Sequence, residues 1–463
     1  MTATLAASRE YAGPVEGARF LSGTAWAVAF ALFLMFTGMM HDFRSTSISQ
    51  DDLHEGMRNA RQEFNSDVSK ALPERKLAFV LSGLIGLFCW ATARKSGIWE
   101  SKLSVTLILL GLGWTTASIF WSQSPGLTMR SLFRVFVYCF LCYGLTLRFS
   151  ALELIKILVV VSSLSVGIAV ATEVFIGAPE DIEDVYRLSG SMHPNSLSRF
   201  AVIVAIPAFA FAWWIPRERV AWLSVLFLAM VVIHLSRCRT SLATALVGFG
   251  VLVLLHFGWK RAVAPLALSL TLIGIVTFAL GAGGRSAIAG AGNTAAMGRV
   301  ESVSTLTGRL PLWNVLFRKA ADRPIVGYGY GGFWDTRNTE AIQKEVGWQA
   351  GHSHNCYIEI LVNVGLVGLC LFLMLGATCF FRSVKISVSQ NLGAYAILAA
   401  LLASAAVNAL AEVGFVLPRE HAIVLGLIAL LTVRSVDSED FGFVIHEESN
   451  NLPASRSIGE TAS

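Results

Sequence analysis

The chain has 463 residues, of which 54% are hydrophobic and only 14% carry a charged side chain. Its mean hydropathy is +0.62, and a charged fraction this far below the roughly 25% of soluble domains argues against a water-soluble globular protein. The net charge of +5 is small for this length, so we expect no nucleic-acid partner.

Apolar blocks of about 17–25 residues recur along the chain, which is the length an α-helix needs to cross a hydrocarbon layer roughly 30 Å thick. We therefore predict an all-α, polytopic integral membrane protein with about twelve transmembrane helices. The predicted spans lie near residues 21–40, 77–93, 103–121, 131–149, 154–176, 200–215, 220–236, 241–257, 262–281, 355–381, 392–412 and 421–434.

The distribution of cations predicts the topology. With the N-terminus inside, lysines and arginines gather in the short cytoplasmic loops, as the positive-inside rule requires. Residues 1–434 are then a single transmembrane domain with two long outward loops, 41–76 and 282–354. Residues 435–463 are acidic and rich in Ser and Asn without apolar periodicity, which predicts a disordered cytoplasmic tail.

The seven cysteines lie mainly inside apolar blocks. This placement favours small buried hydrophobic side chains over a disulfide framework or a zinc site. Cys139 and Cys142 have CxxC spacing, but both lie within a predicted span. We expect no metal and no cofactor.

The second outward loop contains TGRLPLWNVLFRKAADRPIVGYGYGGFW. Thr307 and Pro311 suit a helix start, and apolar residues follow at helical spacing, which predicts a short amphipathic helix: Leu312, Trp313, Leu316, Phe317 and Ala320. Arg309 and Trp313 are four residues apart and share one face, where a guanidinium beside an aromatic plane would suit a phosphate and a sugar. The alternative is an anchor in the lipid headgroup zone.

The glycine-rich run from Gly327 to Gly332 has the composition of a nucleotide-binding loop. It follows Pro324 in an outward segment, however, and lacks the strand and helix that a dinucleotide site requires. We interpret it as a flexible turn. Glycines also let a backbone approach a ligand closely, so a supporting role in binding stays open.

The loop ends in GHSHN, immediately before the span that begins at Cys356. Asn355 is a favourable N-cap, which places His354 at the positive end of a helix, where imidazolium is disfavoured and anions are attracted. His354 is therefore a candidate general base beside an anion site. The alternatives for His352 and His354 are an interfacial polar pair or a metal site, and the sequence offers no third ligand.

Two segments with arginines lie at outward span ends, RLSGSMHPNSLSR with Arg187 and SRCRTS with Arg237 and Arg239. A solitary cation there is costly unless it is paired or faces a polar cavity, and a bound diphosphate would pair it. The alternative is contact with lipid headgroups, which applies most to Arg199 and Arg237. Carboxylates and an amide in or beside spans are candidate partners for these arginines: Glu173, Glu359, Asn363 and Glu412.

This ordered set of motifs resembles the O-antigen ligase and Wzy-type polymerase superfamily of bacterial envelope glycosyltransferases. In that family a large periplasmic loop ends in a histidine motif, and here His354 and Asn355 are followed by Gly365 and Gly368 at the family's spacing. The stretch from GR through W to RPIVGYGYGGFW is most similar to the exopolysaccharide polymerases. HPN and SRCRTS add weaker support.

The resemblance implies an inverting, metal-independent transfer of glycan from an undecaprenyl-diphosphate carrier, at the periplasmic face of the bacterial inner membrane. It implies His354 as the catalytic base and places Arg187, Arg239 and Arg309 where the family has arginines that hold the diphosphate. The neighbouring residues His352, Asn355 and Trp313 are further candidates for substrate binding. The implied partners are the lipid-linked glycan, a glycan or lipid acceptor, and membrane lipids. We expect an enzyme, a polymerase of exopolysaccharide or O-antigen repeat units, because the candidate groups cluster on one membrane face, whereas alternating access favours sites at the midplane. The alternatives are a ligase acting on a lipid A-core acceptor and a flippase or exporter that transfers nothing.

Overall fold

The computed structural model describes residues 20–40, 73–94, 100–177, 186–258, 309–348, 350–390, 393–414 and 420–434. Every regular element within these ranges is a helix. The predicted span at 262–281, the predicted tail at 435–463 and most of the loop at 41–76 lie outside the described residues.

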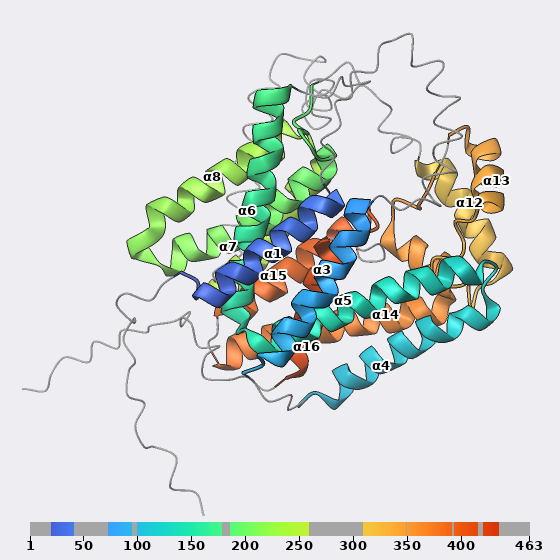
Figure 1. Cartoon of the computed structure of the whole chain (residues 1–463), viewed down its shortest axis with the longest axis horizontal. Helices are drawn as coiled ribbons and strands as arrows, with labels where there is room; N and C mark the ends of the chain where they lie inside the picture. The colour runs from blue at the N-terminus through green and yellow to red at the C-terminus, as the bar shows by residue number, and fades with distance from the viewer. Residues whose placement is uncertain are drawn as a thin grey trace, which may run out of the picture.

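The helices follow one another along the chain and are shown in Figure 1. They are α1 (Gly23–Met40), α3 (Pro73–Ala91), α4 (Lys102–Ala117) with the 3₁₀ turn η1 (Ser118–Trp121), α5 (Pro125–Arg148), α6 (Ala151–Ile176), α7 (Pro194–Trp214), η2 (Pro216–Glu218), α8 (Arg219–Leu235), α9 (Arg239–Phe257), α12 (Arg309–Asp322), α13 (Thr336–Val346), α14 (Cys356–Gln390), α15 (Gly393–Asn408) and α16 (Glu420–Val433).

Among the described residues, seven helical segments are long and apolar enough to cross a membrane, and four shorter apolar helices coincide with further predicted spans. The predicted all-α, polytopic architecture is confirmed, whereas the count of twelve is not, because residues 262–281 are not described. Two helices begin about six residues before their predicted spans, α5 at Pro125 and α7 at Pro194. Proline is favoured in the first helical turn, where its missing N–H has no intrahelical partner.

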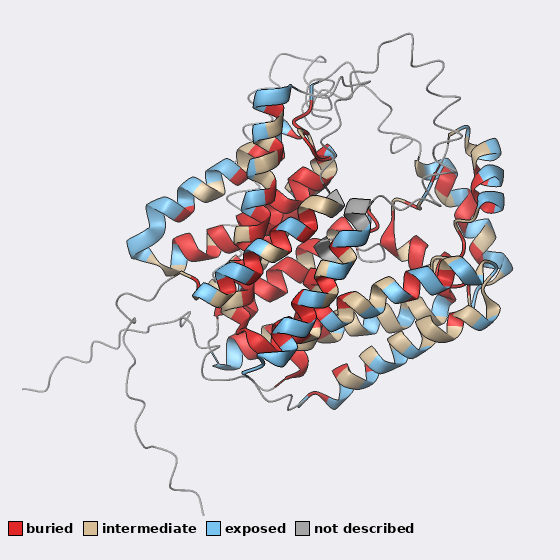
Figure 2. Cartoon of the chain, viewed as in Figure 1, coloured by how far each residue is buried: buried red, intermediate tan, exposed pale blue. Residues whose placement is uncertain are grey.

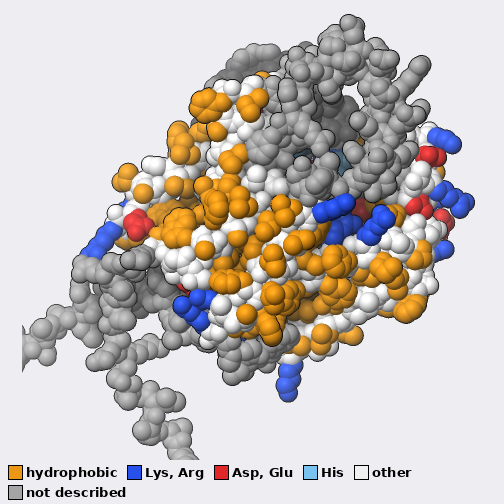
Figure 3. All heavy atoms as spheres, in the orientation of Figure 1, with side chains coloured by type: hydrophobic (Ala, Val, Ile, Leu, Met, Phe, Trp, Pro, Cys, Tyr) orange, Lys and Arg blue, Asp and Glu red, His pale blue; other side chains and the backbone are white. Residues whose placement is uncertain are grey.

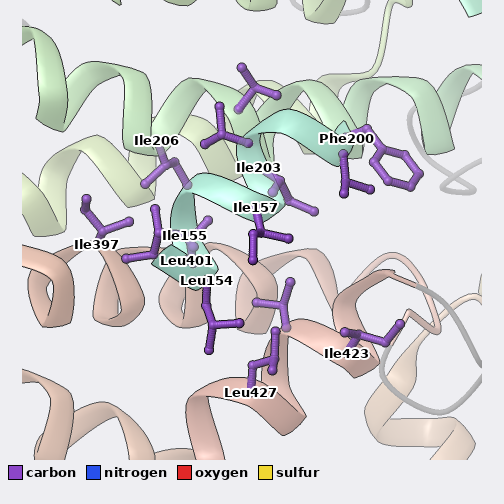
Figure 4. Packing of buried hydrophobic residues seen from close by; sticks show 14 of the residues in the cluster. Leu154, Ile155, Ile157, Phe200, Ile203, Ile206, Ile397, Leu401, Ile423 and Leu427 are labelled. Carbon is purple, nitrogen blue, oxygen red and sulfur yellow. The ribbon is translucent and has the colours of Figure 1, made fainter. Parts of the chain in front are cut away.

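The centre of the bundle is formed by α7 and α15, whose residues are almost all buried. Figure 2 shows this core in red, surrounded by helices that are largely tan and blue. In Figure 4, Ile155 of α6 and Ile206 of α7 pack with Leu401 of α15, and Leu427 of α16 lies nearby. Small residues along α15, such as Ala396 and Ala400, let neighbouring helices approach closely.

The outer helices expose apolar side chains. Phe120 after α4 is 88% exposed, and Phe227 on α8 is 67% exposed. Figure 3 shows hydrophobic side chains over much of the visible face of the described helices. Such a surface is unfavourable in water and suits the hydrocarbon of a bilayer, in agreement with a multi-pass membrane protein.

Cations that the sequence assigns to the cytoplasmic side lie together at one end of the bundle. The N–H of Arg94 donates to the carbonyl of Leu147, and Nη1 of Arg434 donates to the carbonyl of Thr146 at 2.7 Å. Arg382 likewise donates to a carbonyl at the end of α16. Cationic side chains near helix C-termini satisfy carbonyls that have no intrahelical donor. That this end faces the cytoplasm stays a prediction.

The two short helices of the second outward loop, α12 and α13, lie side by side near one end of α14 (Figure 1). The predicted amphipathic helix is confirmed as α12: Leu312, Leu316 and Ala320 are buried in a separate small core with α13 and the first half of α14. Phe317, expected on the apolar face, is instead 50% exposed. Val315 occupies the buried face.

The glycine-rich run packs against a kink in α14. Gly365 has φ 70° and ψ −170°, which interrupts the helix. The freed backbone groups pair with the run and its neighbours: Tyr328 N–H donates to the carbonyl of Val362, Gly329 N–H to Asn363, and Leu366 N–H to Pro324. The run is therefore packed against α14, and its glycines serve close backbone approach to a helix.

Replacing Gly365 with alanine is expected to destabilise the protein by about 1–3 kcal/mol, because this backbone region is accessible almost only to glycine. A Cβ there would also meet the backbone of Ile325. The measurement is thermal unfolding of the detergent-purified variant. Gly376→Ala is the matched control, since Gly376 lies in the regular part of α14 with open space around its Cβ position. Equal stability of the two variants would contradict a structural role for the kink.

Candidate functional site

The turn that carries His354, residues 352–355, is fixed by the first helical turn of α14. We call it the histidine turn. The side-chain oxygen of Asn355 accepts hydrogen bonds from the N–H groups of Tyr357 (2.9 Å) and Ile358 (3.1 Å). This is the predicted N-cap, confirmed in detail. The hydroxyl of Ser353 donates to the carbonyl of Asn355, so the turn is also closed locally.

Glu359, one turn into α14, also stabilises the histidine turn through hydrogen bonds. Its buried carboxylate accepts from the N–H of Ser353 (2.9 Å) and from the indole N–H of Trp334 (2.6 Å). Asn363 donates to the same carboxylate and accepts from the N–H of Gly331. The histidine turn, the glycine-rich run and the α14 kink thus share one hydrogen-bonded network.

His354 has an unusual backbone conformation. Its φ is 53°, and within the described residues only one other non-glycine residue, Arg237 at 48°, has a positive φ. Such conformations cost about 1–3 kcal/mol and concentrate at functional sites. The N–H of His354 donates to Nδ1 of His352 at 3.3 Å, and the two rings lie 4.0 Å apart. His352 therefore supports the backbone and the ring of His354.

Helix α12 reaches the same turn with the face that carries Arg309 and Trp313. The indole N–H of Trp313 donates to the carbonyl of Ser353 at 2.8 Å. Arg309 donates to the carbonyl of Ala411 at 2.6 Å and lies 3.7 Å from a carboxylate oxygen of Glu412. The predicted shared face is confirmed, and the side chain of Arg309 is 21% exposed.

The four residues that follow α15 bind both the start of α14 and Arg309. The carbonyl of Ala409 accepts from the N–H of Cys356, and the carbonyl of Leu410 accepts from the side-chain amide of Asn355. Ala411 and Glu412 bind Arg309. We call residues 409–412 the α15 end segment. It places the histidine turn and Arg309 beside each other, although they are far apart in sequence.

Glu412 extends this network to helix α7. One carboxylate oxygen accepts from the side-chain amide of Asn195 at 3.0 Å, and the other lies 3.6 Å from Nη1 of Arg199. Asn195 in turn accepts from Nη2 of Arg187 at 2.8 Å. Arg187 is buried, and its Nε donates to the carbonyl of Ser236, in the turn between α8 and α9.

The guanidinium groups of Arg199 and Arg309 therefore lie within ion-pair distance of one carboxylate, Glu412, and that of Arg187 is linked to the same carboxylate through Asn195. The three arginines and Glu412 together have a surplus of positive charge. In a partly buried place such a surplus is unfavourable unless an anion compensates it. The arrangement is chemically suited to a multiply charged anion such as a phosphate or diphosphate.

Arg239 is the predicted site residue that the network does not include. It begins α9 and is half-buried, and within the described part of the chain its guanidinium makes no hydrogen bond or ion pair. The turn just before it carries Ser236, which binds Arg187. Its role in binding stays a prediction.

The metal alternative for His352 and His354 gains no third ligand. Within the described ranges, no group of three or more His, Cys, Asp or Glu side chains is placed to hold a metal ion.

Comparisons with known proteins bear on these same segments. Residues 224–373 match a family model described as O-antigen ligase. The chain is also 29% identical over 295 residues to the exopolysaccharide production protein ExoQ of Rhizobium meliloti (strain 1021). That match covers 59% of this chain and 64% of the relative, so the chain spans slightly less than two thirds of the relative's length.

The predicted resemblance to the O-antigen ligase and Wzy-type polymerase superfamily is confirmed. The matched region, residues 224–373, contains most of the predicted site residues: Arg239, Arg309, Trp313, His352, His354 and Asn355. Arg187, Asn195 and Glu412 lie outside it. The site described above therefore joins the matched region to elements before and after it.

Sequence reasoning identified Glu412 only as one of several candidate partners for arginines, and it did not single out Asn195. Of those candidates, Glu412 forms ion pairs with Arg199 and Arg309. The candidates Glu173 and Glu359 have other hydrogen-bond partners. Glu173 accepts from the N–H groups of Ser189 and Gly190, and Glu359 from the N–H of Ser353 and two side chains. The spacing of isolated carboxylates in the sequence does not distinguish one that pairs with an arginine from one that accepts hydrogen bonds from N–H groups. The HPN motif was the available signal for Asn195.

Proposed function

We propose that this protein is a membrane glycosyltransferase that moves glycan from an undecaprenyl-diphosphate carrier at the periplasmic face of the bacterial inner membrane. The observation that carries the proposal is the α15 end segment, which binds Arg309 and the cap residue of the His354 turn. Its last residue, Glu412, links through Asn195 to Arg187. The match of residues 224–373 to O-antigen ligases supports the same function.

In this proposal the arginines bind the leaving group. When the glycosidic bond to the carrier breaks, negative charge develops on the diphosphate, and guanidinium groups held in place beforehand stabilise it without reorganisation. The side chain of Arg309 is partly exposed, while Arg187 is fixed by Asn195 and Ser236. Arg239, at the neighbouring helix start, is a further proposed contact to the diphosphate.

His354 is the proposed general base. It removes the proton from the acceptor hydroxyl as that oxygen attacks the anomeric carbon. The bond from this carbon to the diphosphate oxygen breaks in the same step, so the anomeric configuration inverts and undecaprenyl diphosphate leaves. Trp313 and His352, which touch the same turn, are proposed to contact the sugar. The proposed reaction needs no metal or cofactor.

Polymerisation of exopolysaccharide repeat units is the activity we favour. The relative from Rhizobium meliloti is named an exopolysaccharide production protein, and the glycine-rich run that resembles such polymerases packs against the histidine turn's own helix. The second candidate is a ligase that transfers finished glycan to a lipid A-core acceptor, which the match to O-antigen ligases favours. Both reactions use the same leaving group and base.

Incubation of the purified protein with its lipid-linked repeat unit, followed by sizing of the products, separates these candidates. We expect a ladder of products that differ by one repeat unit, which identifies a polymerase. A single transferred glycan that forms only when a lipid acceptor is added identifies a ligase. Binding of the lipid-linked unit without any transfer would contradict an enzyme and favour a flippase or exporter.

A further inference from the structure

We propose that Asn195 and Glu412 form a positioning pair that sets the separation between Arg187 and Arg309 at the diphosphate. This inference rests on the proposed function and adds two residues to it. Neither residue needs to touch the substrate. Their effect is on the two guanidinium groups, which come from segments more than a hundred residues apart in the chain.

The geometry places the amide of Asn195 between the two halves of the site. Its oxygen accepts from Nη2 of Arg187 at 2.8 Å, and its nitrogen donates to Oε1 of Glu412 at 3.0 Å. The same Oε1 lies 3.7 Å from Nη2 of Arg309. The path from one arginine to the other therefore runs through one amide and one carboxylate.

An amide is suited to this position by its chemistry. It offers an acceptor to a guanidinium and a donor to a carboxylate at the same time. An aspartate in place of Asn195 would keep the acceptor for Arg187 but lose the donor for Glu412, and two carboxylates would then face each other. Because the side chain of Glu412 is only 9% exposed, water would screen this repulsion poorly.

Glu412 also controls how the positive charges are held. Guanidinium groups repel one another, and the carboxylate lies within ion-pair distance of both Arg199 and Arg309. It therefore keeps the arginines close together before the substrate arrives. Such preorganisation lets a diphosphate bind without the cost of ordering the site at that moment.

The pair makes a prediction that a generally structural role does not share. In the double variant Asn195→Asp with Glu412→Gln, the amide and the carboxylate exchange places. The introduced glutamine amide can donate to the introduced aspartate, and that aspartate can accept from Arg187, so the hydrogen bonds between Arg187 and position 412 are rebuilt with the same total charge. The ion pair between position 412 and Arg309 is lost in this variant. If the two residues act as a pair, the second substitution repairs part of the defect caused by the first.

The test measures the Kd for undecaprenyl diphosphate in detergent, together with kcat and KM for transfer, in full-length protein. We expect Asn195→Asp to raise Kd and KM by roughly tenfold, a typical coupling between contacting residues, with a smaller effect on kcat. We expect the double variant to recover part of that loss, because the contact of position 412 with Asn195 is restored while its ion pairs are not. Unchanged binding in Asn195→Asp, or a double variant no better than Asn195→Asp, would overturn the inference.

Asn195→Ala keeps the test decisive if the aspartate variant does not fold, because it removes both hydrogen bonds without adding a charge. A raised KM supports the positioning pair, and an unchanged KM overturns it. Measurements on the wild-type protein distinguish failure of the proposed function from failure of the positioning pair. If it neither binds undecaprenyl diphosphate nor transfers glycan, the proposed function itself fails, whereas normal wild-type activity with unaffected Asn195 variants refutes only the pair.

Discussion

Replacing His354 with alanine is expected to lower the turnover of lipid-linked glycan by about 10²–10⁴-fold, the range that a general base contributes to catalysis. The loss should appear in kcat, because the imidazole acts on the acceptor proton and the arginines that bind the carrier remain in place. Lipid-linked units should accumulate in cells that carry the variant. The measurement is the rate of product formation by purified protein at saturating substrate.

The control for this variant must show that the fold survives. His256→Ala is suitable, because His256 lies in the last turn of α9, the helix that begins at Arg239, and contacts Trp214. We expect wild-type turnover from this variant. Full-length polymer made by His354→Ala would refute the assignment of the base, whatever the control shows.

Replacing Arg309 with alanine is expected to lower kcat/KM by about 10²–10³-fold, as the loss of one group that stabilises a developing negative charge does in other enzymes. Two effects add here. The diphosphate loses one guanidinium group, and Glu412 loses one of the two cations that neutralise it. Arg309→Lys should recover only part of the activity, because an ammonium cannot form the two parallel hydrogen bonds of a guanidinium.

Arg318 provides the matched control on the same helix. Its side chain is 66% exposed and pairs with Glu345 of α13 at the surface. Exposed ion pairs contribute little to stability, about 0–1 kcal/mol, so Arg318→Ala should keep near-wild-type kcat/KM. If the two variants behave alike, Arg309 belongs with the cations that merely meet lipid headgroups.

Local features of the site could be predicted from the sequence because they depend on neighbouring residues. The N-cap at Asn355 follows from a polar side chain placed directly before an apolar block, and the hydrogen bonds to Tyr357 and Ile358 confirm it. The helix that carries Arg309 and Trp313 follows from apolar spacing, and both side chains reach the site from one face.

Long-range partnerships could not be predicted in this way. The sequence contains several carboxylates near span ends, and only tertiary packing brings Glu412 to Asn195, Arg199 and Arg309. The glycine-rich run was interpreted as a flexible turn because its partner, the kink at Gly365, lies in a segment with the composition of an uninterrupted span. Inspection of a single sequence does not reveal which backbone N–H and carbonyl groups of a distant helix have no partner within that helix.

If His354 acts on the reaction while the arginines bind the carrier, binding and transfer respond differently to the loss of this imidazole. Release of undecaprenyl diphosphate is measured for wild-type and His354→Ala protein, and the Kd for the lipid-linked unit is measured on the same samples. We expect nearly equal Kd values and release by the wild type alone. Equal rates of release, or loss of binding in a folded His354→Ala protein, would contradict the proposed roles of His354 and the arginines.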